Sequence, residues 1–165
     1  MKTKVIALFL LIVMGSLSVY AKEKPKDLAK EMNVPKQTWK IVVKNNLSVD
    51  QNFALVDTAL VNEFLFIRAK DKTGNILKVA TKANFKKFVV TYLFTLEIKD
   101  HSIIVTGKYS KNLLLALNYD EKAEASFSKI SYRGFKGAMP QATFTKMLSF
   151  SRLLGKDFEY VKDKT

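Results

Sequence analysis

Few side chains in this 165-residue chain are of the types that carry out chemistry. His101 is the only histidine, and it follows Asp100 in a polar segment typical of a turn. A catalytic triad or a histidine-based metal site would therefore need His101 as its imidazole. A pH-sensitive contact, a lone metal ligand and an ordinary turn residue are the alternatives, and the turn residue fits this setting best.

Carboxylates that lie close together in sequence are the second candidate for chemistry, because paired carboxylates can do acid–base work. The pairs are Glu97 with Asp100, Asp120 with Glu121, and Asp157 with Glu159. We expect these groups to be solvated at turns, in a loop and at a helix end. The chain has no cysteine, nucleophile elbow, phosphate-binding glycine loop or calcium-loop spacing. We therefore expect a protein that is not an enzyme, with no metal, no cofactor and no catalytic residues.

The N-terminal 21 residues have the three-part pattern of a secretory signal peptide. Lys2 and Lys4 precede an apolar run over residues 5–14, and small residues then lead to Ala21. The apolar run is too short for a transmembrane helix, which needs about 20 residues. No cysteine follows it that could carry a lipid. We expect cleavage after Ala21 and a soluble protein in the periplasm or outside the cell.

The charge of the remaining chain favours anionic partners. Residues 22–165 hold 26 Lys and Arg against 15 Asp and Glu, a net charge of +11. Outside the cytoplasm, the matching partners are anionic lipid headgroups, acidic glycans and acidic proteins. Because the lysines are scattered along the chain, a basic soluble surface without a partner is the alternative.

The segment after the signal peptide divides into a linker and one domain. Residues 22–37 are rich in Lys and Glu and contain two prolines, which predicts a flexible linker. Residues 38–165 have the length and apolar content of a single α+β domain. In residues 38–44, alternating apolar and polar positions predict a strand with one buried face, formed by Trp39, Ile41 and Val43.

The middle of the domain reads as a helix followed by hairpins. Ser48 and Gln51 form a capping box, and the apolar spacing after them predicts a helix over residues 49–62. Strands over 63–70 and 76–82 flank a turn in which Gly74 can supply a positive φ. The cleanest strand pattern covers residues 88–99. Its buried face would comprise Val90, Tyr92, Phe94, Leu96 and Ile98.

The C-terminal part follows a tight turn at Asp100 and His101. We expect residues 102–109 to return antiparallel, residues 110–138 to be irregular, and a helix to begin near Pro140. Gly155 would end or bend this helix. The apolar stripe would comprise Phe144, Met147, Leu148, Leu154, Phe158 and Val161. The polar side would carry Lys146, Arg152, Lys156, Lys162 and Lys164, a candidate membrane or partner surface.

The predicted order is β-α-β-β-β-β over residues 38–109, followed by an irregular segment and a C-terminal helix over residues 110–165. Short connections favour an α+β fold with a mainly antiparallel sheet. Four segments of the sequence together resemble a known family. They are the opening strand, Ser48-Val49-Asp50 at the helix start, Lys72-Thr73-Gly74-Asn75-Ile76, and the run from Tyr92 to Asp100. The family is an exported Bacteroidetes-type domain of unknown function with a TATA-binding-protein-like fold, similar over residues 39–109. The resemblance implies a fold but no site, and His101 replaces the glycine expected in its turn.

Two functions remain open from the sequence. The first is an exported, non-catalytic envelope protein that binds a macromolecular or anionic partner. The second is a carrier that holds an apolar small molecule between the sheet and the C-terminal helix. The 12 Phe and 6 Tyr residues on a basic sheet could also stack on nucleic acid bases, but export argues against a nucleic-acid partner.

Overall fold

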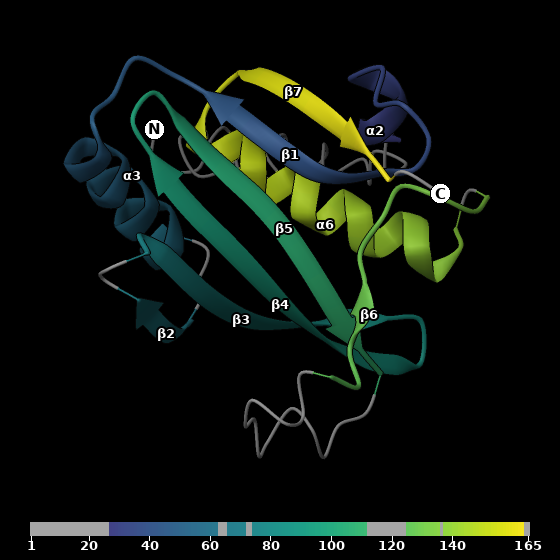
Figure 1. The fold of residues 1–165 in the computed structure, drawn as a ribbon. Coiled ribbons are helices and arrows are strands. Elements are labelled where there is room, and N and C mark those ends of the chain that lie inside the picture. The colour runs from purple at the N-terminus through teal and green to yellow at the C-terminus, as the bar shows by residue number, and fades with distance from the viewer. Residues whose placement is uncertain (1–26, 63–65, 72–73, 112–124, 136, 164–165) are drawn as a thin grey trace, which may run out of the picture.

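A computed structural model describes residues 27–62, 66–71, 74–111, 125–135 and 137–163. These residues form an α+β fold in which one antiparallel sheet packs against helices (Figure 1). The strand order is β2-β3-β4-β5-β1-β7, and the short β6 (Ser128–Lys129) also pairs with β5. The predicted signal peptide over residues 1–21 lies outside the described residues.

The first strand and helix form where the sequence predicts them. β1 spans Thr38–Lys44 and α3 spans Val49–Asn62. The capping box is confirmed, because the Gln51 side chain accepts from the Ser48 N–H at 3.0 Å and Ser48 Oγ accepts from the Gln51 N–H at 3.4 Å. The exposed Asp100 carboxylate accepts from the Val49 N–H at 3.1 Å, which adds a negative charge at the helix N-terminus.

Four consecutive strands joined by three hairpin turns build most of the sheet. They comprise β2 (Phe66–Asp71), β3 (Ile76–Phe85), β4 (Phe88–Lys99) and β5 (Ser102–Ser110). The predicted core face of β4 is confirmed, since all five of its residues are buried. In the described part of the β2–β3 turn, Asn75 adopts a φ of 51°, so the positive φ expected at Gly74 is found at its neighbour.

The C-terminal segment differs from the single helix that the sequence predicts. α6 spans Met139–Leu154 with Pro140 in its first turn, and then β7 spans Asp157–Lys162. β7 pairs antiparallel with β1 and forms one edge of the sheet. The prediction that Phe158 and Val161 extend the helix is therefore wrong. α6 ends before Gly155, and β1 passes so close to this residue that a Cβ atom there would lie 2.7 Å from Val43 Cγ1.

The prediction of a flexible linker over residues 22–37 is wrong for residues 27–37. This segment contains α2 (Leu28–Glu31), and the Ala29 side chain is completely buried in the main core. Asp27 Oδ2 accepts a 2.8 Å hydrogen bond from Gln141 Nε2 on α6. The linker prediction failed because the few apolar side chains of this polar segment are buried against the domain.

A β-bulge changes the expected alternation in β1. The register of β1 against β7 shifts between Thr38 and Lys40, so the two strands do not pair residue for residue there. Thr38 is completely buried, whereas Trp39 is only partly buried and is absent from the core cluster. Ile41 and Val43 face the core as predicted, but the placement of Trp39 beside them is wrong.

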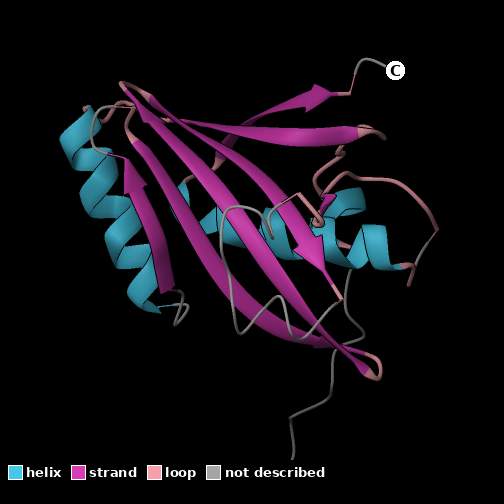
Figure 2. Cartoon of the chain, turned by 60° about the horizontal axis from the view of Figure 1, so that its bottom comes forward, coloured by secondary structure: helices cyan, strands magenta, loops and turns pink. Residues whose placement is uncertain are grey.

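The main core lies between one face of the sheet and the helices. In Figure 2 α6 passes behind the strands, and its buried Phe150 ring stacks on Phe94 of β4 at 5.6 Å. A Cβ atom on Gly107 of β5 would lie 2.9 Å from Ile130 Cδ1 and 3.2 Å from Met147 Sδ. The sheet and α6 therefore pack so closely at this point that β5 needs a glycine.

Candidate binding surface

The face of the sheet opposite the core carries most of the charge of the strands. Paired residues in antiparallel strands point to the same face, so the register identifies its members. Lys40 pairs with Thr106, which pairs with Thr95, which pairs with Lys78, and these four residues form one row across the sheet. The lysines assigned to this face by register are Lys40, Lys44, Lys78, Lys82, Lys99, Lys108 and Lys129. We call this surface the lysine face.

The lysine face contains fewer acidic residues, and two of them form ion pairs with its lysines. Lys44 Nζ lies 2.7 Å from Glu159 Oε2, and Lys99 Nζ lies 2.8 Å from Glu97 Oε1. All four side chains are between 42% and 54% exposed, so each pair contributes little to stability. The hydrogen bond with Lys44 lowers the pKa of Glu159, and the same bond raises the pKa of Lys44.

Trp39 lies near the start of β1, beside two lysines of the lysine face. Lys129 Nζ lies 4.0 Å from the centroid of the Trp39 ring and 2.8 Å from Asp163 Oδ2, while Lys40 Nζ lies 5.4 Å from the ring. The bulge in β1 therefore moves the indole from the core to a partly exposed position between two ammonium groups. One Trp39 contact comes from β6, 90 residues further along the chain, so no local sequence pattern indicates this cluster.

Part of this sheet face is covered. Leu93 and Ala80 are buried with Phe127 in a second, small apolar cluster. Phe127 immediately precedes β6 (Ser128–Lys129), which pairs with the end of β5. Among the described residues, none covers the lysine face over β1, β7 and the adjoining ends of β4 and β5.

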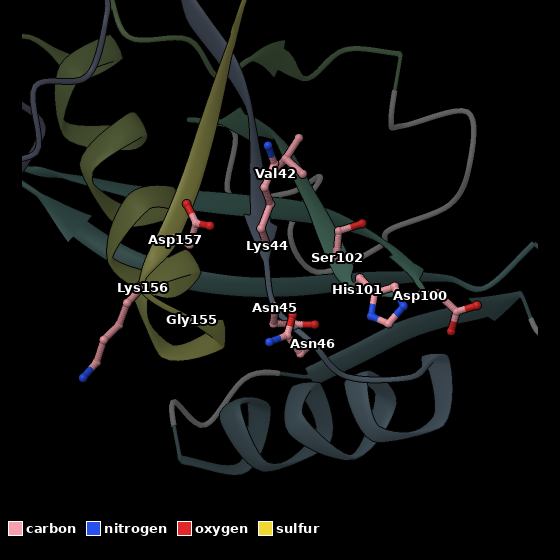
Figure 3. Close-up of a pocket in the computed structure, with 10 residues that line it drawn as sticks. All are labelled: Val42, Lys44, Asn45, Asn46, Asp100, His101, Ser102, Gly155, Lys156 and Asp157. Carbon is pink, nitrogen blue, oxygen red and sulfur yellow. The ribbon is translucent and has the colours of Figure 1, made fainter.

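A shallow pocket of about 730 Å³ lies at one end of the sheet, beside the β4–β5 turn (Figure 3). Its polar lining includes Lys44, Asn45, His101, Lys156 and Asp157. The Asn45 side chain already accepts from the Leu47 N–H at 3.0 Å and donates to Asn52 at 2.7 Å. Several lining groups are thus engaged in holding the β1–α3 loop in place.

His101 and Asp100 both occupy the predicted turn. His101 is exposed with a φ of 61°, and its backbone N–H donates to the Leu47 carbonyl at 2.8 Å. The Asp100 carboxylate caps α3, so the β4–β5 turn is fastened to the start of that helix. Among the described residues, no group of three or more His, Asp or Glu side chains could hold a metal ion.

The predicted carboxylate pairs do not converge on a common site. Glu97 and Glu159 each contact a lysine, and Asp100 is used as a helix cap. Asp157 lines the pocket, and Asp120 with Glu121 lies outside the described residues. In the described part of the chain, the geometry of these carboxylates suits electrostatic binding and structural capping better than proton transfer between neighbours.

The predicted cationic side of the C-terminal helix is divided by the strand that follows it. Lys146 and Arg152 lie on α6, Lys156 lies in the connection, and Lys162 lies at the end of β7. Lys164 lies outside the described residues. No helix in the described ranges is long and apolar enough to cross a membrane.

Comparisons with solved structures give likenesses in fold alone. A TBP-like protein from Parabacteroides distasonis matches with a TM-score of 0.39 and 15% sequence identity. The match covers 72% of this chain and 90% of the other. No protein-family model and no curated protein sequence matches.

Proposed function

We propose that this chain is an exported, non-catalytic envelope protein that binds an anionic macromolecule or surface through its lysine face. Export rests on the signal-peptide pattern of residues 1–21. The segments between the opening strand and Asp100 resemble an exported Bacteroidetes-type domain, and this resemblance also supports export. The observation that carries the binding proposal is the gathering of lysines from several strands on one sheet face, which no helix covers within the described residues.

The arrangement of the lysines suits a partner with many negative charges. Strands in a sheet are about 4.8 Å apart, so lysines on neighbouring strands can contact successive acidic groups of one partner. The exposed ammonium groups of Lys44 and Lys99 can exchange their carboxylate partners for those of a ligand at little cost. Binding by this surface should therefore weaken as salt is added.

The carrier function receives less support from the packing. The buried Phe94 and Phe150 rings stack, and the space beside Gly107 is too small for one additional carbon atom. These contacts lie in the layer between sheet and C-terminal helix where an apolar ligand would need room. The observed packing therefore favours the binding function over the carrier function.

A charge-matched pair of variants tests the proposal. The double variant Lys44→Gln/Lys99→Gln removes two charges from the lysine face, and Lys30→Gln/Arg152→Gln removes two exposed charges on helices. Binding of each protein to dextran sulfate and to anionic vesicles is measured by sedimentation or light scattering at low and high salt.

We expect the first double variant to bind about tenfold more weakly at low salt, and the second to bind like the unmodified protein. Equal losses in both variants would mean that only net charge matters, and they would overturn the assignment to the lysine face. No binding of the unmodified protein to either probe at low salt would overturn the proposal as a whole.

A further inference from the structure

The turn between β3 and β4 lies at the end of the sheet away from α3 (Figure 1). Phe85 pairs with Phe88, so Lys86 and Lys87 form a two-residue hairpin loop. Lys86 adopts a φ of 54°, a left-handed conformation that glycine or asparagine would occupy with less strain. The loop therefore presents two adjacent lysines at its tip, one of them in an unfavourable backbone conformation. We call residues 85–89 the hairpin tip.

Apolar side chains are exposed at the same tip. Phe88 is 43% exposed and Val89 is 37% exposed, although both belong to a strand whose next residues are buried. Ammonium groups surround the rings: Lys87 and Lys111 lie 5.8 and 5.9 Å from the Phe88 centroid, and Lys86 lies 5.4 Å from that of Phe85. The tip thus combines exposed apolar surface with several cations.

The hairpin strands themselves hold no acidic residue near these charges. The sequence contains no Asp or Glu between Asp71 and Glu97, a stretch that includes all of β3 and most of β4. Lys82 adds a further exposed charge on β3 near the tip. The hairpin tip is therefore cationic and partly apolar, whereas on the lysine face Lys44 and Lys99 form ion pairs with Glu159 and Glu97.

We propose that the hairpin tip docks into the surface of an anionic phospholipid bilayer. A bilayer surface offers phosphate groups for the lysines and, just below them, an apolar layer for Phe88 and Val89. Phe is among the apolar side chains that membrane-surface segments bury at this boundary, and each lysine near an anionic membrane strengthens binding about fivefold. An acidic polysaccharide would match the charges but leave these apolar side chains exposed. This inference rests on the proposed function for export and for an anionic partner, and it names the partner.

Because the chain has no cysteine, a single introduced cysteine can carry a polarity-sensitive fluorophore. The label is placed at Val89→Cys in the tip and, as a control, at Val61→Cys, where the side chain is 74% exposed on α3. Each labelled protein is mixed with vesicles of phosphatidylglycerol and phosphatidylcholine, with phosphatidylcholine vesicles alone, and with dextran sulfate. Emission and cosedimentation are recorded together.

We expect a blue shift and a rise in emission at position 89 with the phosphatidylglycerol vesicles only, and no change at position 61. In the unlabelled protein, Phe88→Ser and Lys86→Gln/Lys87→Gln should each weaken vesicle binding about tenfold, with circular dichroism unchanged. Neither variant should alter binding to dextran sulfate through the lysine face.

Two outcomes would overturn the inference while leaving the proposed function intact. One is cosedimentation with vesicles without any spectral change at position 89. The other is binding to dextran sulfate alone, with loss only in Lys44→Gln/Lys99→Gln. Failure to bind any of these probes at low salt would overturn both proposals.

Discussion

The completely buried Asn52 side chain on α3 donates a 2.9 Å hydrogen bond from Nδ2 to the backbone carbonyl of Lys99, at the end of β4. Its Oδ1 accepts from Asn45 Nδ2 at 2.7 Å, in the connection from β1. One amide therefore joins three chain segments at the same end of the sheet. This end also contains the pocket and the β4–β5 turn (Figure 3).

Replacing Asn52 with alanine should destabilise the fold. The variant Asn52→Ala leaves the Lys99 carbonyl and the Asn45 amide without these partners, and an unsatisfied buried polar group costs about 1–3 kcal/mol. Urea unfolding followed by circular dichroism would measure the loss as a lower midpoint. The exposed Asn84→Ala is the control and should change the midpoint little. Equal midpoints for the two variants would contradict the structural role of Asn52.

The N-terminal segment should behave as part of the domain. In Asp27→Ala, both the cap of α2 and the hydrogen bond to Gln141 are lost. We expect a free energy of unfolding lower by about 1 kcal/mol, as for other lost helix caps. Limited proteolysis should also cleave residues 27–37 faster in the variant. Glu31→Ala on the exposed side of α2 is the control. Rapid cleavage of residues 27–37 in the unmodified protein would contradict the packing of this segment against the domain.

The sequence predicts those elements whose pattern is local. β4 and its core face are predicted correctly because the alternation of its 12 residues is visible without a partner strand. α3 is predicted correctly because its capping box lies within four consecutive residues. β7 was missed because Phe158 and Val161 also fit helical spacing after Leu154. The alternation of Phe158 with Tyr160 fits a strand equally well, and pairing with β1 decides between the two.

The candidate surface depends on contacts between distant parts of the chain. Lys40 joins the same row as Thr106 only after β1 pairs with β5, and Trp39 leaves the core only after β1 pairs with β7. Scattered lysines in the sequence therefore gave no sign that several would share one sheet face. The hairpin tip is different, because Phe85-Lys86-Lys87-Phe88 is continuous and a run of basic and aromatic residues there was readable from the sequence.

The close approach of Gly155, just after α6, to Val43 of β1 can be tested by changing the size of these two side chains. Gly155→Ala places a Cβ atom 2.7 Å from Val43 Cγ1, closer than such atoms pack. We expect destabilisation of about 1–3 kcal/mol from overpacking. In the double variant Gly155→Ala/Val43→Ala the clash is removed, so its loss should be smaller than the sum of the two single losses. Additive losses in thermal or urea unfolding would contradict a direct steric contact.

The ion pair between Lys44 and Glu159 gives a test based on pH. Because the hydrogen bond with Lys44 lowers the pKa of Glu159 below its ordinary value of 4.5, the folded state binds this proton less readily than the unfolded state. The stabilisation from this pair is therefore present above pH 4.5 and is lost as the pH falls through the lowered pKa. We expect Lys44→Gln to raise the pKa of Glu159, measured by NMR titration of the side-chain carboxyl carbon. Lys30→Gln, on α2, should leave that pKa unchanged because Lys30 is not among the groups that shift it. An unaltered Glu159 titration in Lys44→Gln would contradict the ion pair.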